Sequence, residues 1–270
     1  MQLNNEKKIK IMGILNLTPD SFSDGGKFNE IDKALYHVSN MIDEGADIID
    51  VGGESSRPGS DGISTEEEID RVIPIIKKIK SEFDIIVSID TVKSVVAEIA
   101  VSECHVDIIN DISALSNDKK MVSIVSKFNI PIVLMHRKGI SKTMQEKPFY
   151  NDVIGEISQF FEERIIFALD NGIKKKNIIL DPGIGFGKRL EDNINIIKNL
   201  AKFEKYNLPI LMGLSRKRFL GEITNEENPE KREIETAIAN LISIKNGASI
   251  LRVHNIKATK KMLDVFYTLN

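Results

Sequence analysis

The chain has 270 residues, of which 41% are hydrophobic and 29% charged, with a formal net charge of −3 and a single Cys. This composition is typical of a globular enzyme-sized protein and excludes a disordered or fibrous one, while the negative charge argues against a nucleic-acid partner. No apolar run approaches the roughly 18 residues of a membrane helix, and MQLNNEKKIK lacks a signal-peptide core, so we expect a cytoplasmic protein without a membrane partner.

Short Ile/Val-rich runs alternate with longer amphipathic segments along the chain. The runs predict strands, and in order they are KIKIMGILN (8–16), DIIDVGG (47–53), DIIVSID (84–90), VDIINDI (106–112), IPIVLMH (130–136), NIILDPG (177–183), LPILMGLS (208–215) and SILRVHN (249–255). The segments between them, such as EEEIDRVIPIIKKIKSEF and EIETAIANLISIKNG, have helical apolar spacing. Strands this apolar are buried on both faces. We therefore predict an α/β fold, a single (β/α)8 TIM-barrel domain over residues 1–270.

In such a barrel, chemistry lies at the C-terminal ends of the strands. Every predicted strand ends in, or is followed by, a polar residue, and the first seven are Asn16, Glu54, Asp90, Asn110, His136, Asp181 and Ser215. Arg252 and His254 belong to the eighth strand. Long connections follow strands 1, 2, 5 and 7, and long loops in compact domains are often functional. We expect these polar groups to share one pocket.

The stretch DPGIGFGKR, residues 181–189, looks like a glycine-rich phosphate loop. It has neither G-x-G-x-x-G nor a closing Lys-Ser/Thr pair, and it follows the sixth strand instead of the first. Asp181 is therefore expected to point a carboxylate into the barrel mouth, with the glycines letting the backbone approach a flat ligand. The alternative is that Asp181 only caps the next turn.

Cationic and hydroxyl side chains gather after the last two strands, in GLSRK and RVH. Loops in this position form the recurrent phosphate site of these barrels, and Arg offers a bidentate fork to phosphate or carboxylate. Ser215, Arg216, Lys217, Arg252 and His254 therefore predict an anion site, the alternative being a solvated surface cluster.

Three further features complete the expected site. Asn16 offers a neutral oxygen for a phosphate-held Mg²⁺, which needs few protein ligands. Asp90 and Asn110 present carboxylate and carboxamide edges that suit recognition of a heterocycle in its plane, which we prefer to a hydrolytic acid and base pair. The loops TPDSFSDGG and GGESSRPGSDG are polar enough to act as lids, and Arg57 precedes Pro58 in a restricted backbone. The chain has no H-E-x-x-H motif and no Cys/His cluster.

Eight ordered motifs together resemble bacterial dihydropteroate synthases of the pterin-binding TIM-barrel superfamily: ILNLTPDSFSDGG, DVGGESSRPG, SIDT, NDI, MH, LDPGIGFGK, GLSRK and RVH. The resemblance covers about residues 9–260. It implies an Mg²⁺-dependent transferase of folate biosynthesis that acts as a homodimer and condenses 6-hydroxymethyl-7,8-dihydropterin pyrophosphate with p-aminobenzoate. It also implies that sulfonamides bind where p-aminobenzoate does.

The resemblance assigns roles residue by residue. Asn16 would contact the metal, and Asp24, Arg57, Asp90 and Lys217 would be catalytic. The pterin pyrophosphate would bind to Ser56, Asp90, Asn110, Met135, Asp181, Gly213, Lys217, Arg252 and His254. Phe186, Ser215, Lys217 and Arg57 would bind p-aminobenzoate. Ser56 stands where the family commonly has Thr, and Asn255 where many relatives have Asp.

The expected reaction is an SN1-like substitution, because cations and metal aimed at the departing pyrophosphate act where charge develops in the transition state. Two alternatives remain. A methyltetrahydrofolate-dependent methyltransferase shares the pterin-binding barrel, but GLSRK, RVH and the TPDSFSDGG loop favour the synthase. A non-catalytic pterin-binding paralogue would keep the binding residues, and only an assay separates it from an enzyme.

Overall fold

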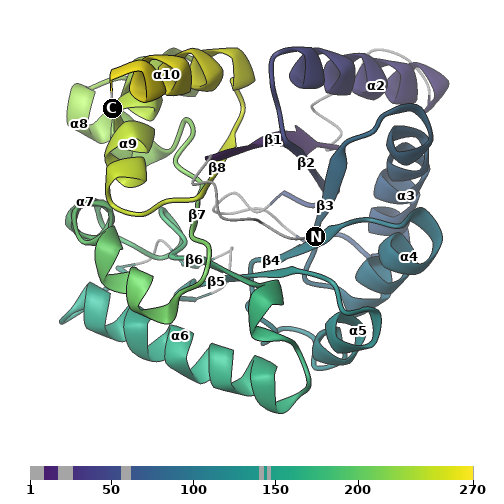
Figure 1. Ribbon diagram of the computed structural model, residues 1–270, viewed down its shortest axis with the longest axis horizontal. Coiled ribbons are helices and arrows are strands. Elements are labelled where there is room, and N and C mark those ends of the chain that lie inside the picture. Colours follow the sequence, from purple (N-terminus) through teal and green to yellow (C-terminus); the bar gives the residue numbers. More distant parts are fainter. Residues whose placement is uncertain (1–8, 18–26, 56–61, 140–142, 145–146, 270) are drawn as a thin grey trace.

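A ring of helices surrounds a rolled parallel sheet in the computed structural model, which describes residues 9–17, 27–55, 62–139, 143–144 and 147–269 (Figure 1). Its strands are β1 (Lys10–Asn16), β2 (Ile48–Gly52), β3 (Ile86–Asp90), β4 (Ile108–Asp111), β5 (Ile132–Met135), β6 (Ile178–Asp181), β7 (Leu211–Met212) and β8 (Ile250–Val253). The sheet order is β6-β5-β4-β3-β2-β1-β8-β7. An isolated parallel bridge between Leu180 and Ile210 joins its two outer edges. The predicted (β/α)8 barrel is confirmed.

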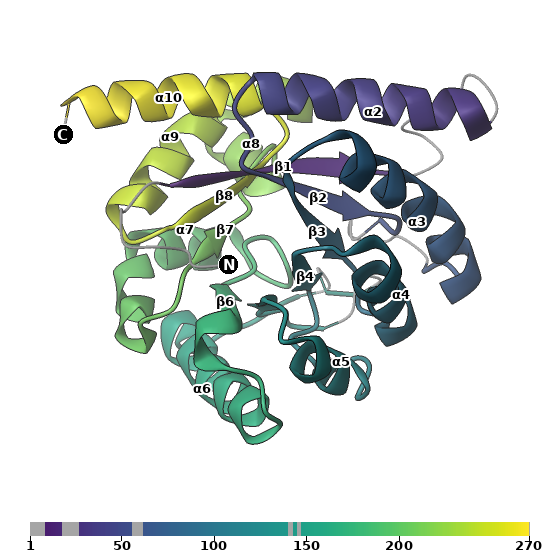
Figure 2. The same ribbon diagram turned by 45° about the vertical axis from the view of Figure 1, so that its right-hand side comes forward.

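Helices follow the strands in turn. They are α2 (Lys27–Asp43), α3 (Thr65–Glu82), α4 (Ser94–Cys104), α5 (Met121–Phe128), α6 (Val153–Asp170), α7 (Leu190–Lys198), α8 (Arg218–Thr224), α9 (Glu233–Lys245) and α10 (Ile256–Leu269). Short 3-10 turns η1 (Lys175–Asn177), η2 (Leu200–Tyr206) and η3 (Pro229–Lys231) join some of them. The two views show α2 beside α10, so the first and last of these helices are neighbours in the ring (Figures 1 and 2). No helix in the described ranges combines the length and apolar character that crossing a membrane requires.

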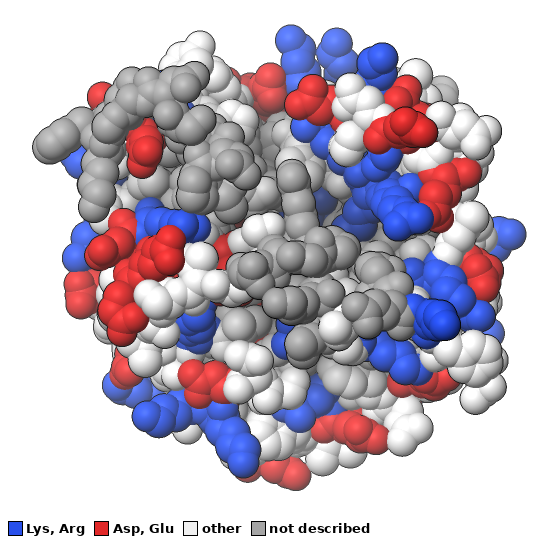
Figure 3. All heavy atoms as spheres, turned by 180° about the vertical axis from the view of Figure 1, so that it is seen from behind, with Lys and Arg blue, Asp and Glu red and all other residues white. Residues whose placement is uncertain are grey.

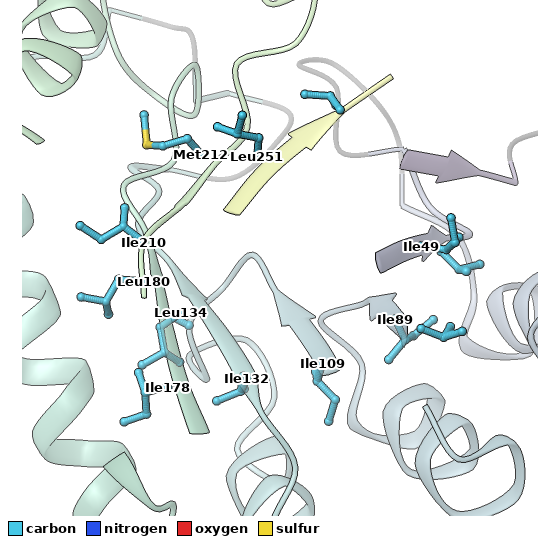
Figure 4. Close-up of a cluster of buried hydrophobic side chains, with 14 of the residues drawn as sticks. Ile49, Ile89, Ile109, Ile132, Leu134, Ile178, Leu180, Ile210, Met212 and Leu251 are labelled. Carbon is cyan, nitrogen blue, oxygen red and sulfur yellow. The ribbon is translucent and has the colours of Figure 1, made fainter. Parts of the chain in front are cut away.

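The two faces of each strand bury different residues, because side chains alternate along a strand. Outward-facing residues such as Ile49, Ile89 and Ile109 pack against the helices (Figure 4). Inward-facing residues from all eight strands fill the barrel: Met12, Ile48, Ile86, Ile108, Val133, Ile179, Leu211 and Ile250. This apolar plug closes one end of the barrel interior. Two residues further along, the inward positions are polar in five of these strands, with Asp50, Ser88, Asn110, Asp181 and Arg252.

The seventh unit differs from its prediction. The strand predicted over 208–215 is paired only at Leu211–Met212, with the isolated bridge at Ile210. It ends early because the Lys217 N–H donates to the Leu214 carbonyl at 3.2 Å, and Arg216 takes a left-handed φ of 60° in that turn. The long connection expected after this strand contains α8, whose Phe219 and Leu220 are buried.

Candidate active site at the barrel mouth

Above the apolar plug, toward the C-terminal ends of the strands, several inward-facing residues are polar. Asp50, Asn110, Asp181 and Arg252 each lie two residues beyond a plug residue on the same strand, so they share its inward direction. Asp90 and Asn16 end their strands. Because all the strands are parallel, these side chains meet at one end of the barrel. Met135, also a predicted site residue, occupies the corresponding position at the end of β5, and Gly213, another one, directly follows β7.

Arg252 is clamped between two carboxylates. Its Nε lies 2.6 Å from Asp50 Oδ2, and its terminal nitrogen lies 2.9 Å from Asp90 Oδ2. Asp50 is fully buried. Burial raises the pKa of Asp90 to about 7, although the Arg252 charge opposes the shift. The clamp fixes the plane of the guanidinium across the mouth, between β8 on one side and β2 and β3 on the other.

Asp50 also orients Asn110. The Asn110 Nδ2 donates to Asp50 Oδ2 at 3.0 Å, so the amide presents its carbonyl oxygen as the acceptor for a ligand. The sequence reasoning missed Asp50, because it examined strand ends and Asp50 lies in the middle of β2. A charged residue inside the otherwise apolar run IIDVG was the signal that could have found it.

Asp181 and the loop after it form another side of the mouth. Asp181 is 6% exposed, and its Oδ1 accepts from the Gly183 N–H at 2.7 Å. Burial raises the pKa of this carboxyl, while Lys217 acts against the shift. Lys217 donates to the Ile184 carbonyl, and its Nζ lies 4.6 Å from the Phe186 ring centre. Asp181 therefore caps the turn that follows β6, and it lies near Lys217, whose Nζ faces the Phe186 ring.

The last two strands meet at a hydroxyl and an imidazole. Ser215 Oγ lies 2.9 Å from His254 Nδ1 and accepts from the His254 N–H at 3.2 Å. Arg216 was predicted to belong to the anion site, but its Nε forms an ion pair with Glu233 of α9 at 2.7 Å. Burial lowers the pKa of Lys217 to about 8. The corner of the mouth at β7 and β8 thus offers Ser215, Lys217 and His254.

His136, expected among the converging strand-end groups, faces away from the mouth. Its ring packs edge-on against Phe160 of α6, with centroids 4.9 Å apart. Burial lowers its pKa well below the ordinary value, so the imidazole is neutral. Its Nδ1 lies 3.0 Å from the Nζ of Lys188, a buried residue that sequence reasoning also missed. Three predicted site residues, Asp24, Ser56 and Arg57, lie outside the described residues.

Charges of both signs are interspersed on the face opposite that of Figure 1, as the space-filling view shows (Figure 3).

The mouth itself combines acceptors with cations: Asp90, Asn110 and Asp181 are acceptors, and Arg252 and Lys217 carry positive charge. A parallel barrel with this mouth is a site for a polar heterocycle that carries an anionic group. Fold and site together define that class of protein.

Comparison with known proteins narrows the class. The family described as pterin binding enzyme matches residues 12–254, and the chain belongs to that family. A dihydropteroate synthase from Clostridium beijerinckii is 46% identical over 98% of this chain and 96% of its own length. The Yersinia pestis dihydropteroate synthase, in a crystal structure with a sulfonamide drug, superposes with a TM-score of 0.91 at 38% identity, covering 98% of this chain and 95% of that one.

A third relative is the Xanthomonas albilineans dihydropteroate synthase. Its structure with 4-aminobenzoic acid has a TM-score of 0.91 at 40% identity, covering 97% of this chain and 93% of that one. Its complex with 7,8-dihydropteroate has a TM-score of 0.88 at 38% identity, with coverage of 97% and 94%. The similarity therefore extends through both chains and is not confined to the mouth.

Proposed function

We propose that this protein is a dihydropteroate synthase, a transferase that joins 6-hydroxymethyl-7,8-dihydropterin pyrophosphate to p-aminobenzoate and releases pyrophosphate. One observation carries the proposal: the acceptors Asp90, Asn110 and Asp181, here called the acceptor slot, lie at the same barrel mouth as the corner formed by Ser215, Lys217 and His254. The near full-length similarity to synthases from C. beijerinckii and Y. pestis supports it over a methyltransferase, and the assay below separates it from a non-catalytic paralogue.

The pterin would lie in the acceptor slot. A pterin presents several N–H donors along one edge, and the Asp181 carboxylate and the Asn110 carbonyl oxygen are matching acceptors. Each charged hydrogen bond is worth about 1.5 to 3 kcal/mol. Arg252, held flat by Asp50 and Asp90, would stack on the ring, and Met135 and Gly213 would line the slot.

The pyrophosphate would lie toward β8 and β1. Arg252 and His254 would contact it, with Ser56 as a further hydroxyl donor and Asp24 and Arg57 acting from the two long loops. These roles come from the family resemblance.

Magnesium fits this arrangement only as a companion of the phosphates. The described residues hold no cluster of three or more His, Cys, Asp or Glu side chains suited to a metal ion. Asn16 Oδ1 lies at the mouth, 3.8 Å from where a Cβ on Gly52 would stand, and Mg²⁺ bound to phosphates keeps waters and needs few protein oxygens. Asn16 would thus hold Mg²⁺, which when bound neutralises charge on the leaving pyrophosphate.

The p-aminobenzoate would occupy the corner at β6 and β7. Phe186 offers a ring face, Ser215 and Lys217 offer donors to the carboxylate, and Arg57 would approach from the second loop. Sulfonamides would compete for this position, and the Y. pestis enzyme has been crystallised with a sulfonamide drug.

The reaction is an SN1-like substitution. The bond between the pterin methylene carbon and the pyrophosphate oxygen breaks, the amine nitrogen takes its place, and that nitrogen loses one proton. Leaving-group stabilisation dominates, because cations aimed at the developing charge contribute most in a water-excluded site. An aniline nitrogen needs no strong base. A secondary isotope effect near unity at the methylene would contradict this mechanism.

The enzyme would act in the cytoplasm as a homodimer. Ile234, Ile238 and Ile242 are exposed at four-residue spacing on α9, which places them on one face of that helix. Val265 and Leu269 are exposed on the neighbouring α10. Exposed apolar side chains gathered on two neighbouring helices are typical of a protein interface.

A single assay tests the function: pyrophosphate release in the presence of magnesium, with both substrates and with each alone. Release should require both. Asp181→Ala should abolish pterin binding by calorimetry, and Asn16→Ala should raise the magnesium concentration needed for half-maximal rate. Lys202→Met, an exposed change remote from the mouth, is the matched control. Release that proceeds without p-aminobenzoate would refute the assignment.

A further inference from the structure

Lys188 is a buried cation that the proposed reaction does not use. It is 3% exposed, and its ammonium lies among four acceptors: Gly183 O at 2.8 Å, Phe186 O at 3.2 Å, His136 O at 3.3 Å and His136 Nδ1 at 3.0 Å. Two of these belong to the loop after β6 and two to the end of β5. A buried charge requires such partners, so Lys188 ties the loop to the strand.

The loop is pressed closely against β5. Gly183, Gly185 and Gly187 all have left-handed φ angles, of 65°, 81° and 65°. A Cβ on Gly183 would lie 1.9 Å from the His136 carbonyl oxygen, and one on Gly187 would lie 2.1 Å from that of Lys138. This path turns several carbonyl oxygens toward one point, where they repel one another unless a cation lies between them. The Lys188 ammonium is that cation.

The same loop carries the groups that face p-aminobenzoate. The Ile184 carbonyl, between the two that Lys188 holds, accepts from Lys217, and the Phe186 ring lies 4.6 Å from the Lys217 Nζ. Lys217 is a substrate-facing group and must be able to exchange the Ile184 carbonyl for a ligand. The loop keeps its shape during that exchange only if something else holds it.

We propose that Lys188 is a positioning residue for p-aminobenzoate. Its ammonium fixes the carbonyls of Gly183 and Phe186 against β5 and so sets the place of the Phe186 ring and of Lys217. The inference rests on the proposed function of the mouth. Lys188 touches no substrate and acts through the loop.

The pterin slot depends less on this tie. Asp181 lies in β6 itself, paired with Met135 of β5, and its carbonyl accepts from the His136 N–H at 2.8 Å. Asn110 and Asp90 are held from β2 and β8 by Asp50 and Arg252. Loss of Lys188 should therefore affect the two substrates unequally, which a general loss of folded protein does not do.

Lys188→Met tests the proposal, because it keeps the length of the side chain and removes the charge. We expect KM for p-aminobenzoate to rise at least about tenfold, with the calorimetric Kd for the pterin pyrophosphate changed less than about threefold. Lys202→Met, on the exposed surface, should match the wild type. A purely structural role lowers the active fraction, which reduces kcat and leaves both KM values unchanged.

His136 supplies a second test in case Lys188→Met does not fold. His136→Asn keeps an acceptor near the Nδ1 position and should retain KM for p-aminobenzoate within about twofold, whereas His136→Leu removes the acceptor and should raise it. A wild-type enzyme that turns over, with an unchanged p-aminobenzoate KM in both Lys188→Met and His136→Leu, overturns the positioning role alone. If the wild type releases no pyrophosphate, the proposed function is wrong, and this inference, which rests on it, is wrong as well.

Discussion

Asp50 illustrates how one buried carboxylate organises a site without facing the ligand. Its Oδ2 receives both Arg252 Nε and Asn110 Nδ2, while its Oδ1 is buried with no partner in the described structure. Removing one partner of a buried charge leaves the other uncompensated. Arg252 and Asn110 therefore owe their orientation to the same atom, and both are expected to contact the pterin.

Asp50→Asn should weaken pterin binding by about tenfold to a hundredfold, roughly 1.4 to 2.8 kcal/mol. The new amide can donate to Asn110 and reverse the carboxamide, which would turn an acceptor away from the ligand. Calorimetry with the pterin pyrophosphate measures the loss. Ser88→Ala is the matched control, since Ser88 is paired in register with Asp50 on the next strand and its buried hydroxyl has no described partner. Equal affinities for the two variants would contradict the role of Asp50.

Asp90 gives the site a pH dependence with two opposite signs. Burial raises its pKa from 3.8 to about 7, so the folded protein binds a proton there that the unfolded chain has released between those values. This contribution to stability is complete below about pH 3.8 and is lost as pH rises through about 7. Pterin affinity should change the other way and increase through pH 7, because the ionised carboxylate holds Arg252.

The comparison with Asp90→Asn isolates this titration from others in the same range, including Lys188, whose pKa burial lowers to about 7. Unfolding free energies and pterin Kd values are measured for both proteins from pH 5 to 8. The difference in stability between wild type and variant should fall with pH while the wild-type affinity rises. A difference that is flat across this interval would show that Asp90 does not titrate there.

Among the elements, the loop after β6 is the one most constrained by its backbone. Gly183→Ala should destabilise the protein by at least about 2 kcal/mol, since the left-handed conformation costs an L-residue about 1 to 2 kcal/mol and the added carbon would meet the His136 carbonyl oxygen at 1.9 Å. The melting temperature should fall by at least about 4 °C. Gly62→Ala, where the nearest atom is 3.5 Å away, should melt within about a degree of the wild type. An unchanged melting temperature for Gly183→Ala would mean that the loop has room to move.

The elements also show why part of the structure was predictable from sequence. The inner strands are buried on both faces, so IIDVG and IVSID appear as apolar runs that few other structures produce. Strand β7 is only two residues long and α8 only seven. Segments of that length are too short for the spacing of apolar residues to identify them as a strand or a helix. The sequence therefore predicted the number of units correctly and placed the boundaries of the seventh unit wrongly.

At the scale of the whole molecule, the site was predictable where it follows from barrel geometry. Asp90, Asn110, Asp181 and Arg252 face one mouth because parallel strands end together. Asp50 and Lys188 were not predicted, because their importance comes from contacts between strands and loops far apart in sequence: Arg252 is 202 residues from Asp50, and Lys188 is 52 residues from His136. The charged residue inside the apolar run IIDVG marks Asp50 as unusual, but no local pattern identifies the distant partners of Asp50 and Lys188.

The proposed dimer is a property of the whole molecule. Ile234, Ile238 and Ile242 are 73%, 55% and 43% exposed on one face of α9, and a groove of about 470 Å³ between α9 and α10 is lined by Met262, Phe266 and other residues. Burying such a surface against a second copy contributes about 25 cal/mol for each Å² of apolar area. The surface belongs to helices outside the barrel, so a change there leaves the mouth intact.

Ile238→Asp should convert the dimer to a monomer in light scattering coupled to size-exclusion chromatography, because it places a charge in the middle of the buried apolar face. Ile166→Asp on α6, where the isoleucine is 58% exposed, is the matched control and should remain dimeric. Both variants should melt near the wild-type temperature at low protein concentration, since neither side chain belongs to the core. A wild type that is monomeric at micromolar concentration would refute the dimer, and an Ile238→Asp protein that stays dimeric would show that this face is not its interface.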